Sequence, residues 1–173
     1  MADAFTLITG GARSGKSTYA ERLAVSSGRP VLFVATAEAR DEDMRRRIQA
    51  HKASRPAEWR TIEEPLSVAV AIRAQGNGAP VVLLDCVTLL VSNLLQAGRP
   101  VQPEIDALVQ WRTQSGARLI AVTNEVGLGV VPDNVLARQY LDALGLANQA
   151  LAAAADEVIL MVAGLAVAIK RPH

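Results

Sequence analysis

The segment Gly10–Ser17, with the sequence GGARSGKS, constrains the fold of this chain more than any other feature. It follows the apolar run Phe5–Thr9 and precedes a stretch of helix-forming composition that begins at Lys16. The pattern G-x-x-x-x-G-K-S between a strand and a helix is typical of a P-loop, whose glycines let backbone N–H groups converge on an anion. Lys16 is expected to contact the β- and γ-phosphates of a nucleotide, and Ser17 to ligate Mg²⁺. The segment therefore predicts a nucleoside triphosphate site.

Short apolar runs alternate with longer helical segments along the rest of the chain. Strands are predicted at Phe5–Thr9, Val31–Ala35, Val81–Asp85, Leu119–Thr123 and Val158–Val162, and helices at Lys16–Ser26, Asp41–Lys52, Leu66–Ala74, Glu104–Ser115 and Asp133–Ala154. This alternation predicts an α/β fold with a mainly parallel sheet and helices on both faces. With the P-loop, it favours a P-loop NTPase fold of the RecA-like type. A last strand at Ala166–Lys170 is expected, and an antiparallel edge position for it stays open.

Length and charge limit the classes of protein to which the chain can belong. Its 173 residues suit one domain over residues 1–173, since the expected turns at Gly28–Pro30, Gly76–Pro80 and Gly98–Pro100 are too short to be linkers. Lys and Arg number 18 against 17 Asp and Glu, which argues against a nucleic-acid partner held by overall charge. The apolar run Val158–Ile169 is shorter than the roughly 20 residues that span a bilayer. With one cysteine, Cys86, and no signal-peptide pattern, the chain is predicted to be cytoplasmic and without a membrane span.

A carboxylate ends the predicted strand Val81–Asp85, at the position where P-loop enzymes commonly carry a second metal-holding group. By itself, an Asp at this position is equally consistent with a turn or a cap. The preceding P-loop favours a role for Asp85 at Mg²⁺ or in activating an acceptor. Cys86, its neighbour, is interpreted as a small buried residue rather than a nucleophile.

The predicted helix Asp41–Lys52 contains the internal histidine, His51. Met44, Ile48 and His51 fall on one helical stripe, so His51 is expected to face inward. One interpretation is a core histidine satisfied by a hydrogen bond. The other is a nucleophile, because a neutral imidazole is competent to attack phosphorus.

Basic and aromatic side chains follow His51 closely. Lys52, Arg55 and Arg60 form a cluster that is suited to neutralise phosphates. Trp59 is equally consistent with a core position and with a surface on which a base stacks. Farther along, Asn124 and Glu125 follow a predicted strand at its carboxyl end, where ligands bind in open parallel sheets, so both are candidate substrate or metal contacts. The alternative is that they cap the next segment.

In combination, these motifs resemble the bifunctional adenosylcobinamide kinase/adenosylcobinamide-phosphate guanylyltransferase family. The similarity rests on GGARSGKS, ATA at 35–37, RIQAHKASRPAEWRTIEEP at 47–65, TNEVGLGVVP at 123–132 and NQALAAAADEV at 148–158. The resemblance implies two reactions in assembly of the nucleotide loop of coenzyme B12. Adenosylcobinamide is phosphorylated with ATP or GTP, and GMP is then transferred from GTP through a guanylylated histidine, which gives adenosylcobinamide-GDP and pyrophosphate.

The resemblance also implies the site residues. His51 is the matching histidine, and Lys16 is expected to act with it in catalysis. The expected nucleotide contacts are Gly10, Gly11, Ala12, Arg13, Ser14, Gly15, Lys16, Ser17, Ala35, Thr36, Ala37, Lys52, Ala53, Ser54, Arg55, Glu63 and Asp85. Ser17 and Asp85 are the expected ligands of Mg²⁺, although some relatives carry Glu in place of Asp85.

The expected partners are the corrinoid substrate, beneath a loop that contains Gly127 and Gly129, and further copies of the chain, with a trimer implied by the resemblance. Two other functions stay open from the sequence. A plain P-loop kinase with a structural His51 transfers phosphoryl groups without forming a covalent nucleotide. A RecA-like ATPase or nucleotide switch acts on DNA or a protein, although the near-neutral charge counts against nucleic acid.

Overall fold

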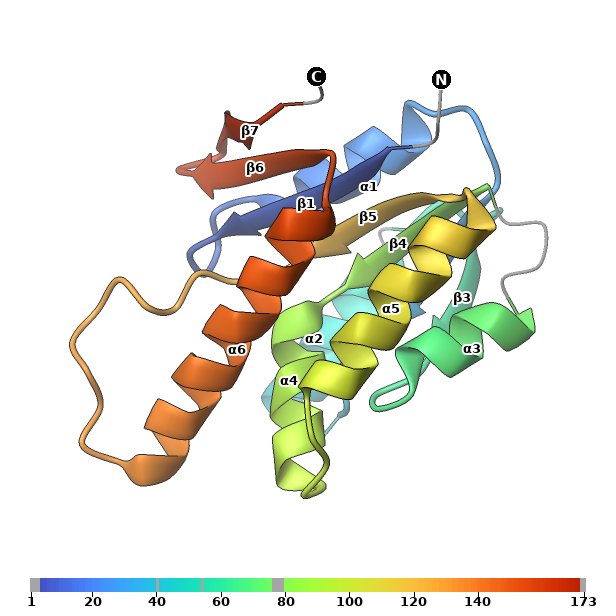
Figure 1. Ribbon diagram of the computed structural model, residues 1–173. Helices are drawn as coiled ribbons and strands as arrows, with labels where there is room; N and C mark the ends of the chain where they lie inside the picture. The colour runs from blue at the N-terminus through green and yellow to red at the C-terminus, as the bar shows by residue number, and fades with distance from the viewer. Residues whose placement is uncertain (1–3, 40, 54, 76–79, 172–173) are drawn as a thin grey trace.

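The computed structural model describes residues 4–39, 41–53, 55–75 and 80–171. The elements in chain order are β1 (Phe5–Gly10), α1 (Lys16–Val25), β2 (Val31–Ala35), α2 (Glu42–Ala53), β3 (Arg60–Glu63), α3 (Val68–Gln75), β4 (Val81–Asp85), α4 (Val87–Gln96), α5 (Gln102–Ser115), β5 (Arg118–Val122), α6 (Val135–Ala154), β6 (Glu157–Val162) and β7 (Leu165–Lys170). The strands form one sheet in the order β3-β2-β4-β5-β1-β6-β7 (Figure 1). The expected turn at 76–80 lies largely outside the described residues.

The sheet is parallel except at one edge. β1 pairs in parallel with β5 and β6, and β4 pairs in parallel with β2 and β5. β7 runs antiparallel to β6, which decides the orientation that the sequence left open for the last strand. The prediction of a mainly parallel α/β sheet is confirmed.

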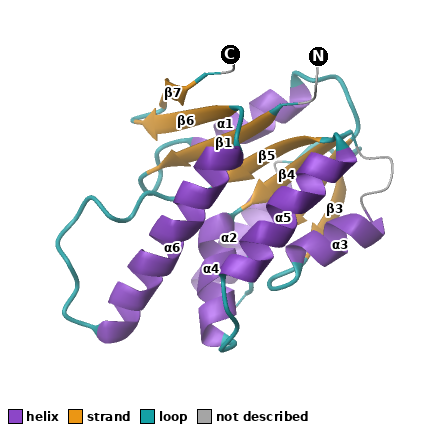
Figure 2. Cartoon of the chain, in the orientation of Figure 1, coloured by secondary structure: helices purple, strands orange, loops and turns teal. Residues whose placement is uncertain are grey.

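Helices cover both faces of the sheet, as predicted. Alternate strand residues point to opposite faces, so that Leu32 packs into one apolar cluster and Phe33 into the other. The first cluster takes buried residues from α3, α4, α5 and α6, whereas Ala20 and Ala24 of α1 pack in the second. Figure 2 shows α4, α5 and α6 on the near side of the sheet, with α1 on the far side.

Two elements were missed from the sequence. α4 has ten residues and follows β4 after the single residue Cys86, and a short, mostly apolar run of this kind does not distinguish a helix from a strand. β3 has four residues, of which Ile62 is the buried one, so it carries little of the apolar run by which the other strands were recognised. Among the described residues, no helix has the length and apolarity that crossing a bilayer requires.

Candidate active site

The P-loop connects β1 to α1, and its backbone requires glycine at both ends. Gly10 has φ 145° and Gly15 has φ 93°, a region that side chains with a Cβ rarely adopt. A Cβ at Gly10 would lie 2.4 Å from the carbonyl oxygen of Met161 in the neighbouring strand β6. Farther along, the N–H of Gly164 donates to the carbonyl of Ser14 at 3.1 Å. The strand pair β6–β7 therefore holds one side of the loop.

Lys16 begins α1 and is 6% exposed. Its ammonium nitrogen donates to the carbonyl of Gly11 at 2.5 Å and lies 3.4 Å from the Ser14 hydroxyl. Burial lowers the pKa of Lys16, while the nearby Cys86 and Asp85 act in the opposite direction. The Lys16 ammonium is therefore held next to the backbone of the P-loop, where the phosphates of a nucleotide are expected to bind.

A cavity of about 430 Å³ lies at the carboxyl ends of the central strands, next to the P-loop. We call it the main cavity. It is lined by residues of the loop and α1, of β2, α2 and β3, and of β4, α4 and β5. These are Ala12, Arg13, Lys16, Ser17, Phe33, Ala35, Ala37, Met44, Ile48, His51, Arg55, Glu63, Asp85, Cys86, Thr88, Leu89, Val122 and Asn124.

His51 reaches this cavity from the last turn of α2. Met44 and Ile48 of the same stripe also line it, so the stripe faces this cavity rather than the core. His51 itself is exposed, which contradicts the interpretation of a core histidine. The imidazole faces a solvent-accessible cavity that it shares with Lys16.

Asp85 and Ser17 meet in the main cavity. The Ser17 hydroxyl hydrogen-bonds the Asp85 carboxylate. Burial raises the pKa of Asp85, and this hydrogen bond together with the charges of His51, Arg55 and Lys16 opposes the rise. A hydroxyl and a carboxylate side by side at a P-loop are donors that suit Mg²⁺, which takes one or two protein oxygens beside water and phosphate.

Cys86 also lines the main cavity, but its chemistry is inert. Burial raises the pKa of its thiol to about 12, and the charge of Asp85 adds to the effect. The thiolate is the nucleophilic form, so Cys86 stays unreactive near neutral pH, in line with the interpretation from sequence.

Thr36 holds the backbone next to the carboxylate. Its hydroxyl donates to the carbonyl of Cys86 at 2.7 Å and accepts from the Cys86 N–H at 2.8 Å. Its side chain therefore fixes the β4–α4 junction, while its neighbours Ala35 and Ala37 line the main cavity.

Arg55 lies between the main cavity and a second one. Its guanidinium stands over the ring of Phe33, with 3.6 Å from Cζ to the ring centroid. Its Nε and Nη1 are buried and meet no hydrogen-bond acceptor within the part of the chain that the structure describes. Burial lowers the pKa of Arg55, and the charges of Asp85, Glu21 and Glu63 oppose this. A buried guanidinium with unused donors suits an anionic ligand.

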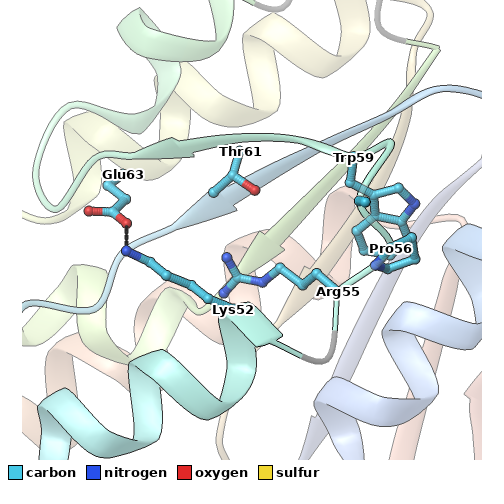
Figure 3. Close-up of a pocket in the computed structure, with 7 residues that line it drawn as sticks. Lys52, Arg55, Pro56, Trp59, Thr61 and Glu63 are labelled. Atoms are coloured by element: carbon cyan, nitrogen blue, oxygen red, sulfur yellow. Dashed lines mark ion pairs between the residues drawn. The ribbon is translucent and has the colours of Figure 1, made fainter.

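The second cavity, of about 420 Å³, is bounded by the end of α2 and by β3, and we call it the β3 cavity (Figure 3). It is lined by Lys52, Arg55, Pro56, Ala57, Trp59, Thr61 and Glu63. Lys52 and Glu63 form an ion pair across it. Arg55 and Glu63 line both cavities, so the two adjoin.

Most of the predicted site residues gather around these two cavities. The main cavity brings together Ala12, Arg13, Lys16, Ser17, Ala35, Ala37, His51, Arg55, Glu63 and Asp85, and Lys52 lines the β3 cavity. Among the described residues, Gly10, Gly11, Ser14, Gly15, Thr36 and Ala53 line neither cavity. Ser54 lies outside the described residues.

Sequence reasoning missed several neighbours of the site. Glu21 lies one turn after Ser17 on α1. Burial raises its pKa, the nearby charge of Asp85 adds to the rise, and the charges of His51 and Arg55 oppose it. Its i+4 spacing from Ser17 was the available signal. Phe33 and Leu89 also line the main cavity. Phe33 lies in the strand β2, which was interpreted as buried core, and Leu89 lies in α4, which was not predicted. Of the two candidate contacts after β5, Asn124 lines the main cavity and Glu125 does not.

Known proteins similar to this chain place the geometry in context. Residues 6–169 match the protein family described as "Cobinamide kinase / cobinamide phosphate guanyltransferase". The chain is 47% identical over 166 residues to "Bifunctional adenosylcobalamin biosynthesis protein CobP" from Pseudomonas aeruginosa, covering 95% of this chain and 96% of that protein. It is 44% identical over 179 residues to "Bifunctional adenosylcobalamin biosynthesis protein CobU" from Salmonella typhimurium, covering 95% and 98%.

A solved structure supports the fold prediction. The KaiC-like protein PH0186 from Pyrococcus horikoshii superposes with a TM-score of 0.54 over 92% of this chain and 71% of its own. The sequences are 18% identical, so this similarity concerns the fold alone. With the seven-stranded sheet, it agrees with the predicted RecA-like P-loop NTPase fold.

Proposed function

This chain belongs to the cobinamide kinase / cobinamide phosphate guanyltransferase family, and from that premise we propose that its one nucleotide site carries out both reactions. It phosphorylates adenosylcobinamide with ATP or GTP. It then transfers GMP from GTP to adenosylcobinamide phosphate through a guanylyl-His51 intermediate. The products are adenosylcobinamide-GDP and pyrophosphate.

The observation that carries the proposal is the shared cavity of His51, Lys16 and Ser17. In the transfer, an imidazole nitrogen of His51 attacks the α-phosphorus of GTP. A P–N bond forms, the bond to the bridging oxygen breaks, and pyrophosphate leaves with that electron pair while the imidazole loses its proton. A phosphate oxygen of the corrinoid then attacks the same phosphorus, and the P–N bond breaks to regenerate the imidazole.

Phosphorylation uses the same P-loop. The corrinoid hydroxyl oxygen attacks the γ-phosphorus, the bond to the β-phosphate oxygen breaks, and the hydroxyl proton is released. Lys16 supports this step by placing positive charge beside the oxygens that gain negative charge. Asp85 is suited to orient the hydroxyl or to accept its proton, because its raised pKa reduces the cost of protonation.

Mg²⁺ is proposed as the metal of this site. The Ser17 hydroxyl and the Asp85 carboxylate, which hydrogen-bond each other, provide the oxygen donors to hold it. When bound, Mg²⁺ neutralises charge on the phosphates and lowers the cost of pyrophosphate departure.

The corrinoid is the proposed acceptor, and the enzyme is proposed to act in the cytoplasm without a nucleic-acid partner.

We also propose a homo-oligomer, with three copies expected from the resemblance. Exposed apolar side chains support an association between copies, since large apolar surfaces mark interaction sites. They lie on the segment between β5 and α6, where Leu128 is 89% and Val130 95% exposed, and on β7, where Leu165 is 70% exposed. Figure 1 shows the first segment extending away from the sheet.

The test is the mass of the intact protein after incubation with GTP and Mg²⁺, followed by peptide mapping. One added guanylyl unit on His51 is expected, which acid removes and base does not. His51→Ala is expected to abolish it, and Gln49→Ala, an exposed neighbour on α2, is the matched control. Labelling that persists in His51→Ala refutes the assigned nucleophile. Phosphoryl transfer to the corrinoid without any covalent nucleotide in the unchanged protein favours a plain kinase.

A further inference from the structure

A third cavity, of about 310 Å³, lies between the end of α4 and the start of α6, and we call it the α4–α6 cavity. Figure 1 shows both helix ends extending away from the sheet in the same direction. Leu95 of α4 and Leu136, Ala137 and Tyr140 of α6 give the cavity a largely apolar lining. Leu136 is 60% exposed, so the single chain leaves this surface open to solvent.

The described residues that line the α4–α6 cavity carry no charge near neutral pH. Tyr140 is the ionisable group among them, and burial raises its pKa to about 12, so its phenol stays protonated. The main cavity, by contrast, is lined by Lys16, Arg55 and Asp85. A ligand of the α4–α6 cavity is therefore expected to bring apolar surface and neutral polar groups, unlike the phosphates expected in the main cavity.

The α4–α6 cavity lies one helical turn from the main cavity. Thr88 of α4 lines the main cavity, and Ser92, four residues later on the same side of the helix, lines the α4–α6 cavity. The Tyr140 hydroxyl lies 3.5 Å from the carbonyl oxygen of Thr88. The Thr88 hydroxyl accepts from the N–H of Asn124, a further residue of the main cavity, at 2.8 Å. The two cavities are thus joined by contacts around Thr88.

The proposed corrinoid acceptor has the dimensions to occupy both cavities at once. Its reactive hydroxyl ends a flexible arm, an amide-linked aminopropanol, that leaves the edge of the macrocycle. The arm is a little longer than two residues of extended chain, or about 8 Å. Along α4, Ser92 lies about 6 Å and Leu95 about 10 Å beyond Thr88. The arm can therefore pass Thr88 into the main cavity while the macrocycle, for which a nucleotide leaves no room there, stays outside.

The polar groups of the α4–α6 cavity are amides and a hydroxyl. The Gln96 amide nitrogen donates to the Ser92 hydroxyl at 2.9 Å, and the second N–H and the oxygen of that amide offer further bonds. The Asn134 side-chain oxygen caps α6 by accepting from the N–H groups of Leu136 and Ala137, and this cap does not use its amino group. Carboxamides at the rim of a corrin ring are both donors and acceptors, so they match these side chains.

We propose that the α4–α6 cavity binds one edge of the corrin macrocycle of the acceptor. Leu95 and Leu136 contact its apolar surface, and Gln96 and Asn134 bind its peripheral amides. This assignment rests on the proposed function, because it takes the end of the corrinoid arm to be the group that reacts at the P-loop. The nucleotide and the corrinoid then approach the reacting phosphorus from different sides, so they bind without displacing each other.

The test measures the binding of adenosylcobinamide to the unchanged protein and to Leu136→Ser by equilibrium dialysis. The substitution removes apolar contact area, so the dissociation constant is expected to rise by ~10-fold. The KM for the corrinoid in phosphorylation should rise equally, while kcat, the KM for GTP and guanylyl labelling of His51 stay unchanged. Leu146→Ser, at a 59% exposed position on the same helix, is the matched control and should change none of these. An unaltered corrinoid affinity in Leu136→Ser overturns the proposal.

Gln96→Ala tests the opposite wall of the cavity. Gln96 is exposed, so the fold is expected to tolerate the change, and loss of its hydrogen bond should raise the dissociation constant of the corrinoid by ~3-fold. Bound adenosylcobinamide should also slow amide hydrogen exchange at the end of α4 and the start of α6. Full affinity in Gln96→Ala contradicts the contact with this wall, and protection confined to other elements overturns the proposed site.

A second copy of the chain is the competing occupant of this surface, and sedimentation velocity distinguishes it from the corrinoid. Leu136→Ser is expected to keep the association state of the unchanged protein while it loses corrinoid affinity. A loss of affinity that accompanies dissociation into smaller species identifies the surface as an interface between copies and overturns the proposal.

The two proposals fail in different ways. If GTP labels His51 and the corrinoid is turned over, but Leu136→Ser and Gln96→Ala bind the corrinoid normally, the macrocycle site is wrong and the proposed function stands. If both variants lose corrinoid affinity but the unchanged protein neither acquires a guanylyl unit nor phosphorylates the corrinoid, the proposed function is wrong and the macrocycle site stands.

Discussion

The Ser17 hydroxyl donates a hydrogen bond to the Asp85 carboxylate, so the first turn of α1 and the end of β4 meet inside the main cavity. The pairing places a carboxylate that is costly to bury beside the P-loop. Burial raises the pKa of Asp85, which means that the folded chain holds this proton more tightly than the unfolded chain does. Ionised Asp85 therefore costs stability, and the cost grows as the pH rises above the ordinary value for Asp.

Asp85→Asn is expected to stabilise the fold and to impair catalysis. The amide cannot ionise, so the melting temperature should rise near pH 7, and the gain should vanish below about pH 4, where Asp in the unfolded chain is also protonated. Both reactions should fall by about 100-fold or more, as for loss of one transition-state electrostatic contact. Thermal unfolding across pH and the two activity assays measure these effects. Asp142→Asn, at an exposed position on α6, is the control, and a lower melting temperature in Asp85→Asn at pH 7 contradicts the prediction.

Arg55→Lys is expected to weaken nucleotide binding although the charge is kept. Lysine lacks the planar group that lies over Phe33 and offers its donors from one nitrogen. The KM for GTP should rise by about 10-fold, which corresponds to about 1.4 kcal/mol. Steady-state kinetics measure it. Arg45→Lys, on the exposed side of α2, should leave KM unchanged, and an unaltered KM in Arg55→Lys rules out the geometric role.

Gly10→Ala is expected to destabilise the chain and to abolish nucleotide binding. The new Cβ would lie 2.4 Å from the Met161 carbonyl oxygen, and the φ of 145° is strained for alanine. Strain of this kind costs about 1–3 kcal/mol before the steric overlap is added. Chemical denaturation gives the free energy of unfolding. The control is Gly145→Ala in α6, where a Cβ meets nothing within 4 Å and should stabilise by up to about 1 kcal/mol.

Replacing Leu128 and Val130 by serine is expected to weaken self-association. Both side chains are almost fully exposed in the single chain, so an interface between copies is the state that would cover them. Sedimentation velocity should show a trimer for the unchanged protein and smaller species for the double variant at the same concentration. A monomer at all concentrations for the unchanged protein would disprove the proposed assembly. Val25→Ser, at an exposed position on α1, serves as the control.

The fold was largely predictable because its signals are local. The strands Val31–Ala35 and Val81–Asp85 were predicted with the observed ends, since a continuous apolar run flanked by polar residues marks a strand buried on both faces. β3 was missed because it is an edge strand of only four residues, which its pairing with β2 defines and its own sequence does not. α4 was missed because only Cys86 separates it from β4, and its short, mostly apolar sequence does not distinguish a helix from a strand.

The site was predictable in part. The P-loop and the stripe of His51 follow from spacing, so Lys16 and His51 were expected as members of the site and line one cavity. The β3 cavity could not be foreseen, because it exists through the pairing of β3 beside β2 and the return of the chain after α2. The sequence left two alternatives for Trp59, a core position and a surface on which a base stacks. In the structure its ring packs on Phe33 and also lines the β3 cavity.

The close approach of Gly10 to Met161 links the P-loop to β6, a strand that follows much later in the sequence. The phosphate-binding motif is translated before the backbone that supports its shape, in β6 and the turn at Gly164. A nascent chain therefore completes its nucleotide site only after β6 and this turn have left the ribosome.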